Sequence, residues 1–190
     1  MNKHDNNDKT IFGFWVYLMT DLVMFAALFA AFAVLRNNTF GGIAIRDIFN
    51  PPFVLIETLI LLTSSFSIGL TILSAQANKK TQTIFFLLTT FALGVSFLTM
   101  ELIEFSHLIH DGNSFQRSAF LSSFFTLVGT HGLHITAGLV WMGILIIQVL
   151  GRGLTISTVR KLTLLTLFWH FLDIVWIFIF TIVYLFGGIL

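Results

Sequence analysis

Five long apolar stretches, separated by short polar breaks, run along the chain. Each comes close to or exceeds the roughly 20 residues that an α-helix needs to cross about 30 Å of hydrocarbon. None alternates apolar and polar positions, as the spans of a membrane β-barrel do over about 10 residues. The pattern therefore predicts an all-α integral membrane protein, a bundle of five transmembrane helices. We place the spans at residues 11–35, 53–77, 84–105, 119–150 and 162–185.

The breaks between the spans are short and rich in turn residues. Asn-Pro-Pro at residues 50–52 precedes the second span, and proline is tolerated at the first helical positions because its missing N–H has no partner there. The fourth stretch is longer than a bilayer requires, so we expect it to tilt or to extend beyond the membrane. We predict a polar tail, residues 1–10, followed by a single five-helix membrane domain, residues 11–190.

Composition excludes several classes of protein. With 56% hydrophobic and 10% charged residues, a soluble domain of this size would lack its charged surface. The net charge of +1 provides no basic surface for nucleic acid, so we expect no nucleic-acid partner. The absence of cysteine excludes iron–sulfur clusters, thiolate copper sites and haem attached through C-x-x-C-H.

The distribution of lysine and arginine predicts the orientation of the chain. The side that holds the N-terminus has seven of these residues, namely Lys3, Lys9, Lys79, Lys80, Arg152, Arg160 and Lys161, and the other side has Arg36, Arg46 and Arg117. Cytoplasmic loops carry an excess of Lys and Arg. We therefore predict a cytoplasmic N-terminus and tail and a periplasmic C-terminus. Trp15, Tyr17 and Tyr184 lie near span ends, as residues of interfacial aromatic belts do.

Acidic and histidine side chains within the spans are the candidate functional residues. At about 1.5 Å per residue, Asp21 lies about 15 Å into the first span. His170 and Asp173 lie about 12–17 Å into the fifth span. His131 and His134 lie well inside the fourth, so these five residues form a middle tier. A second tier lies nearer the outer face and consists of Glu57, Glu101, Glu104 and His107.

A charge in hydrocarbon is costly, so these side chains must face the bundle interior and find a partner or stay protonated. Four interpretations remain open: hydrogen bonds between helices, a lipid- or water-filled cleft, a proton relay, and ligation of haem or metal. We interpret one set as structural ties between the fourth and fifth spans: His131, His134, His170 and Asp173. We interpret a second set as lipid-cleft or protonatable residues: Asp21, Glu57, Glu101, Glu104 and His107.

Three stretches resemble the subunit III family of haem–copper oxidases. FWHFLDIVWIFIF, residues 168–180, resembles the signature of the family's last helix, and GTHGLHITAGL, residues 129–139, resembles its preceding helix. FGFWVYLMTDLVMFAALFA, residues 12–30, is similar to the family helix with an intramembrane carboxylate, which is Glu in many members and Asp21 here. The resemblance covers roughly residues 10–187 and is strongest to the five-helix form of bacterial bo-type ubiquinol oxidases.

The resemblance implies a function that the residues alone do not assign. It implies subunit III of a proton-pumping terminal ubiquinol oxidase in the bacterial inner membrane, where ubiquinol reduces oxygen to water. In this family, haems and copper belong to subunit I, so no catalytic, cofactor-binding or metal-binding residue is expected in this chain. The expected partners are subunit I, which this chain would help to assemble and stabilise, subunits II and IV, and phospholipid in a helix cleft near Asp21.

Two alternatives stay open at this stage. The first is an independent proton or ion transporter that uses the intramembrane acids, although such transporters usually contain inverted repeats, which we do not find in the sequence. The second is a b-type cytochrome subunit with His131, His134 and His170 as ligands, although a haem–copper centre needs more imidazoles than these three.

Overall fold

The computed structural model describes residues 3–36, 51–110 and 118–185, without the side chains of residues 3–8 and of Pro51. These residues form five long α-helices and one short π-helix, and no strand is found among them. All five helices are long and apolar enough to cross a membrane, which confirms the predicted helical bundle. The elements are α1 (Lys3–Leu35), α3 (Pro51–Gln76), α4 (Lys80–His110), α5 (Ala119–Arg152), α6 (Ile156–Ile179) and η1 (Phe180–Leu185).

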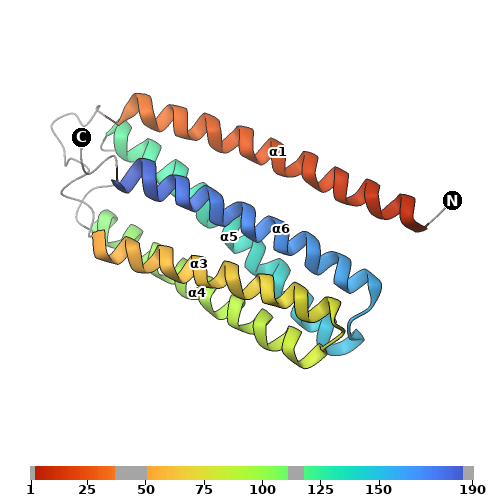
Figure 1. Ribbon diagram of the computed structural model, residues 1–190. Helices are drawn as coiled ribbons and strands as arrows, with labels where there is room; N and C mark the ends of the chain where they lie inside the picture. Colours follow the sequence, from red (N-terminus) through yellow and green to blue (C-terminus); the bar gives the residue numbers. More distant parts are fainter. Residues whose placement is uncertain (1–2, 37–50, 111–117, 186–190) are drawn as a thin grey trace.

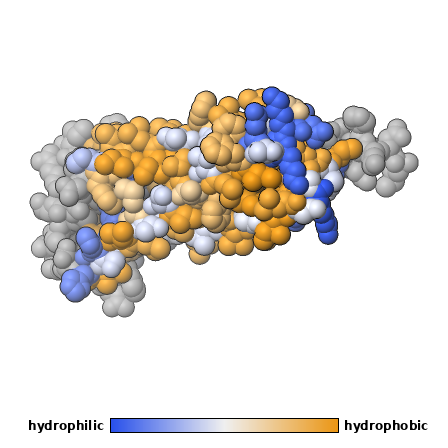
Figure 2. Space-filling model, turned by 90° about the horizontal axis from the view of Figure 1, so that it is seen from below, coloured by the Kyte–Doolittle hydropathy of each residue, from blue (hydrophilic) through white to orange (hydrophobic). Residues whose placement is uncertain are grey.

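The helices run side by side along one long axis (Figure 1). The helix α3 packs against α4 and α6, and α5 packs against the same two helices, so these four form the bundle. The helix α1 packs mainly against α5 and less extensively against α6. In a space-filling view, apolar residues cover most of the middle of the molecule and hydrophilic residues gather toward its ends (Figure 2). This distribution is typical of a bundle that crosses a bilayer.

Several helices extend past the predicted span limits. Residues 3–10, which we predicted as a tail, continue α1, and α4 occupies Lys80–His110 where we expected residues 84–105. Hydropathy marks only the part of a helix inside hydrocarbon, whereas backbone hydrogen bonding continues into polar flanks. The 34 residues of α5 measure about 51 Å, more than the about 30 Å of hydrocarbon, as expected for a helix that tilts or extends outward.

Local capping defines the connection between α5 and α6. Gly153, at a φ of 73°, ends α5 and donates its N–H to the carbonyl of Val149. A positive φ is readily adopted by glycine because it has no Cβ. Thr155 then caps α6, since its hydroxyl accepts a hydrogen bond from the N–H of Thr158. The short turn leaves α5 and α6 as adjacent helices of opposite direction (Figure 1).

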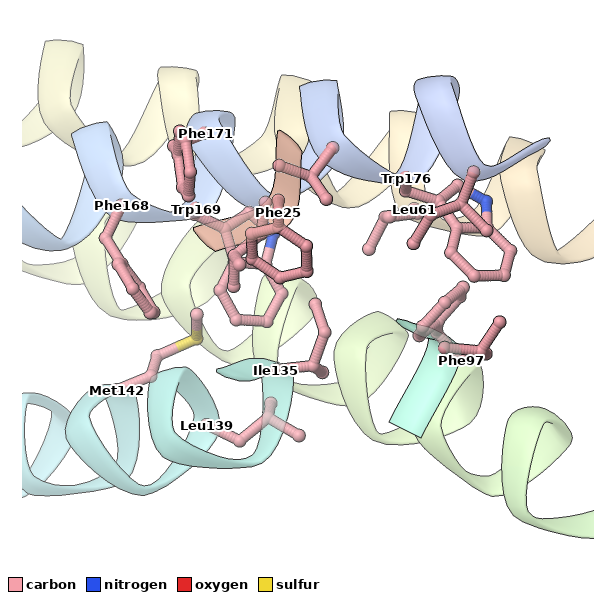
Figure 3. Close-up of a cluster of buried hydrophobic side chains, with 14 of the residues drawn as sticks. Phe25, Leu61, Phe97, Ile135, Leu139, Met142, Phe168, Trp169, Phe171 and Trp176 are labelled. Atoms are coloured by element: carbon pink, nitrogen blue, oxygen red, sulfur yellow. The ribbon is translucent and has the colours of Figure 1, made fainter. Parts of the chain in front are cut away.

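Two buried indoles fix α6 against α3. Trp169 donates its Nε1–H to the Ser64 hydroxyl over 3.0 Å, and Trp176 donates to the Thr58 hydroxyl over 3.1 Å. Each hydroxyl donates its own proton to a carbonyl of α3, so its lone pairs are left to accept the indole. The Trp176 ring also meets Phe97 of α4 edge-on, with ring centroids 4.7 Å apart (Figure 3). These contacts set the register of α3, α4 and α6.

Candidate functional site

His170 and Asp173 lie at the contact between α6 and α3. The Ser65 hydroxyl is hydrogen bonded to Nδ1 of His170 over 2.7 Å. Asp173 interacts with the same hydroxyl and with His170, while its Oδ1 is enclosed and has no hydrogen-bond partner among the residues described. This hydrogen bond therefore joins α6 to α3, whereas we expected a tie to α5. A nearly uniform apolar sequence does not indicate which neighbouring helix each face of α6 meets, and α6 packs against both.

His131 lies in an aromatic enclosure between α4, α5 and α6. Its side chain is fully buried, and neither ring nitrogen has a hydrogen-bond partner in the described part of the chain. The ring stacks on Trp176 with centroids 5.3 Å apart and meets the edge of Phe97 at 6.1 Å. His131 therefore contacts the neighbouring helices α4 and α6 through the aromatic packing of its ring.

His134 and Asp21 face each other between α5 and α1. Nε2 of His134 lies 3.8 Å from Oδ2 of Asp21, and Nδ1 lies 2.7 Å from the carbonyl oxygen of Thr130. Because a carbonyl only accepts, Nδ1 must carry a proton. The imidazole is therefore cationic if Nε2 is protonated, and it is neutral if the proton lies on Asp21 instead. The pair is a polar contact that joins α1 to the bundle.

The three glutamates that we predicted as lipid-cleft or protonatable residues lie together near the C-terminal end of α4. Glu57 of α3 is fully buried, and neither of its oxygens has a hydrogen-bond partner within residues 3–36, 51–110 and 118–185. Glu101 and Glu104 of α4 interact electrostatically with it, and Oε2 of Glu101 is also enclosed without a partner. His107, one turn further along α4, is exposed and remains outside this cluster.

Tyr184 completes the carboxyl cluster, a contact that the sequence interpretation missed. Its hydroxyl donates to Oε2 of Glu104 over 3.3 Å, and its ring lies 6.2 Å from that of Trp176. Tyr184 belongs to the π-helix η1, whose wider turn changes the direction of side chains relative to an α-helix. Because Tyr184 lies near the end of a span, the sequence indicated an interfacial aromatic residue. No residue pattern in the sequence predicts the π-turn.

A groove of about 740 Å³ lies between α4 and α5 beside this cluster. Its residues are Leu98, Glu101, Leu102, Phe105, Gly129, Gly132, Leu133, Thr136, Ala137 and Val140. At Gly132 the two helices approach so closely that an added Cβ would lie 2.7 Å from Oε1 of Glu101. The glycine therefore provides the space in which the carboxyl group lies.

A second groove, of about 430 Å³, lies at the opposite end, where α1, the end of α3 and the start of α6 meet. Arg160 lines it together with Ile11 and Asn78, and the Nε of Arg160 is enclosed without a hydrogen-bond partner from the described residues. Polar groups at a helix end next to apolar helix faces suit the headgroup and chains of a lipid.

The described residues contain no cluster of three or more His, Asp or Glu side chains placed to hold a metal ion. His131, His134 and His170 have separate surroundings and separate contacts. The described groups are suited to hydrogen bonding between helices, to holding protons and to contact with lipid. They do not converge as a set of ligands.

Comparison with known proteins gives one consistent family. A family model described as cytochrome c oxidase subunit III matches residues 4–188. A cytochrome bo(3) ubiquinol oxidase subunit 3 of Pseudomonas aeruginosa is 56% identical, over 98% of this chain and 89% of the relative. A quinol oxidase subunit 3 of Bacillus subtilis is 44% identical, over 93% and 87%. A cytochrome c oxidase subunit 3 of Bacillus sp. (strain PS3) is 43% identical, over 92% and 84%.

Proposed function

Because the chain belongs to the cytochrome c oxidase subunit III family, we propose that it is subunit 3 of a bacterial terminal ubiquinol oxidase. The observation that carries this assignment is the 56% identity to a ubiquinol oxidase subunit 3 over 98% of the chain. The complex transfers electrons from ubiquinol to oxygen, and this chain is a multi-pass subunit of it in the inner membrane. The match to a cytochrome c oxidase subunit 3 makes the electron donor the point to test.

Within this complex the chain is a non-catalytic, cofactor-free subunit, and the haems and copper belong to subunit I. The separate surroundings of His131, His134 and His170 support this role, since a haem needs axial ligands that converge on one iron. The same separation argues against a b-type cytochrome. An optical spectrum of the isolated chain is expected to lack a Soret band.

The chain supports the assembly and stability of its partners, with subunit I as the main one and subunits II and IV as the others. Its exposed surface supports this role, because α1 offers a long apolar face that includes Phe12, Val23 and Val34 and that none of the other described helices covers. Large exposed apolar patches commonly form interfaces with other proteins or with lipid.

We assign the N-terminus to the cytoplasm and phospholipid to the groove near Arg160. The cations Lys79, Lys80, Arg152 and Lys161 belong to the same end of the bundle as Arg160, which fits the positive-inside rule. Arg160 offers its guanidinium charge to a phosphate, and Ile11 offers an apolar wall to an acyl chain. Asp21 remains our candidate for a protonatable group at a lipid-facing cleft, through its contact with His134.

Purification of the tagged chain in mild detergent tests the assignment. We expect the other oxidase subunits to co-purify and the sample to show a haem spectrum. Mass spectrometry identifies the subunits, and a chain that purifies alone from membranes with active oxidase would contradict the proposal.

One observation favours a second candidate, an independent proton transporter. Glu57 and Glu101 carry enclosed carboxyl oxygens to which no described residue donates a hydrogen bond, as acids on a proton path do. Liposomes that contain only this purified chain discriminate between the candidates. The subunit assignment predicts no proton flux above that of empty liposomes, and a flux abolished by Glu57→Leu would favour the transporter.

A further inference from the structure

The groove between α4 and α5, which we call the hollow, has a limited length along the apolar surface. Its wall on α5 extends from Gly129 to Val140, which is about 16 Å at about 1.5 Å per residue. Beyond Val140 the same face of α5 continues with the large exposed side chains Ile144 and Ile147. A partner helix that crossed the membrane would need a seam of about 30 Å, so the hollow fits a smaller occupant.

The hollow opens toward lipid and has apolar edges. Leu102, Leu133 and Val140 line it and are 58%, 68% and 61% exposed. Its volume of about 740 Å³ falls within the about 300–1,000 Å³ of small-molecule sites. An occupant that enters through these edges must itself dissolve in the membrane.

One polar group of the hollow lacks a partner. Glu101 is 2% exposed, and its Oε2 has no hydrogen bond to any residue that the structure describes. The other polar side chain of the lining, Thr136, donates its hydroxyl to the carbonyl of Gly132 over 2.8 Å. The walls of the hollow therefore leave an oxygen of this carboxyl group unsatisfied, and a buried polar atom without a hydrogen bond is costly. A ligand with a hydroxyl group would remove this cost.

From these observations we propose that the hollow binds a membrane-soluble molecule with a hydroxyl-bearing ring, of the quinol class, and that Glu101 accepts its hydroxyl. The apolar tail of such a molecule leaves past Leu133 or Val140 into the bilayer. The identification as a quinol rests on the proposed function, because a ubiquinol oxidase draws its substrate from the membrane. The inference concerns binding only and assigns no electron transfer to this chain.

The shape and chemistry of the hollow favour a quinol over a phospholipid as its occupant. An acyl chain would fill the space between Leu98 and Phe105 but would leave the Glu101 carboxyl group without a hydrogen bond. A quinol ring fills the same space and supplies the donor.

Photolabelling of the whole purified complex, reconstituted in lipid nanodiscs, tests the inference. The probe is an azido-ubiquinol, used without oxygen so that it stays reduced, and mass spectrometry locates the adduct. We expect an adduct within residues 98–105 or 129–140, and we expect excess ubiquinol to suppress it. The haem spectrum and subunit composition of the same sample test the proposed function separately, so that a failure of either claim is recognised.

Variants at the edge and floor of the hollow make the test specific. Ala137→Phe fills the hollow from its exposed edge, and Glu101→Leu removes the acceptor at similar size. Each is expected to lower the labelling of these segments by about fivefold to tenfold. The matched control Ala92→Phe changes an exposed alanine of α4 that does not line the hollow, and it should leave the labelling unchanged.

Two results would overturn the inference. One is labelling of the active complex that spares both segments or that persists in both variants. The other is an adduct of a photoreactive phosphatidylethanolamine in these segments that excess ubiquinol does not displace, since this would make the hollow a site for acyl chains.

Discussion

Buried polar residues of this protein differ in how well their hydrogen bonds are satisfied. The indoles of Trp169 and Trp176 have hydroxyl acceptors on α3, whereas carboxyl oxygens of Glu57 and Glu101 have no hydrogen-bond partner among the described residues. In hydrocarbon an unsatisfied polar group is destabilising unless something else contacts it. We therefore expect the indoles to contribute stability within the chain and the two glutamates to depend on protonation or on a ligand.

Gly132→Ala tests the close contact between α5 and Glu101 of α4. The new Cβ would lie 2.7 Å from Oε1 and 3.1 Å from the carboxyl carbon of Glu101, so the carboxyl group must shift. We expect a loss of about 1–3 kcal/mol, seen as a lower thermal midpoint of the complex. Gly129→Ala is the matched control, because its Cβ would meet Phe105 at an ordinary 3.7 Å. An equal loss in both variants would contradict the account.

The contact between His134 and Asp21 is suited to a double-mutant cycle. Asp21→Leu and His134→Leu each leave the other group without its partner between α1 and α5. We expect the double variant to be more stable than the sum of the two single losses predicts, with a coupling of about 0.5–2 kcal/mol. The free energy of unfolding of the complex in detergent measures the coupling. Additive losses would mean that the 3.8 Å contact contributes nothing.

Helices were largely predictable from the sequence, and their contacts were not. A chain in lipid must satisfy its backbone internally, so long apolar stretches become helices whatever their neighbours are. Helix limits were less predictable, because the polar residues that begin α1 and α4 carry no hydropathy signal. The partner of His170 on α3 and the π-turn at Tyr184 depend on packing between helices, which a nearly uniform apolar pattern does not encode.

The hydrogen bond between Trp176 and Thr58 should set the register of α6 on α3. Trp176→Phe keeps the aromatic contact with Phe97 but removes the donor to the Thr58 hydroxyl. We expect a loss of about 0.5–1.5 kcal/mol in the free energy of unfolding. Thr58→Val removes the acceptor, and it should cost little more once Trp176 is already Phe. If Thr58→Val lowers the free energy of unfolding as much in the Trp176→Phe background as it does alone, the hydrogen bond does not stabilise the contact between α3 and α6.

The whole molecule has separate polar ends and a largely apolar surface between them (Figure 2). Because the sequence contains no cysteine, single Ser→Cys variants report on orientation without a background signal. Ser157 lies near the start of α6 and Ser106 near the end of α4, and both are exposed. With a cytoplasmic N-terminus, Ser106→Cys should react with an impermeant maleimide in intact spheroplasts and Ser157→Cys only after lysis. The reverse pattern would contradict the predicted orientation.

The electron donor of the complex that purifies with this chain tests the central claim most directly. Oxygen consumption by that complex should be rapid with ubiquinol and negligible with reduced cytochrome c, as its 56% identity to a ubiquinol oxidase subunit 3 leads us to expect. Rapid oxygen consumption with cytochrome c and none with ubiquinol would contradict the assignment to a quinol oxidase.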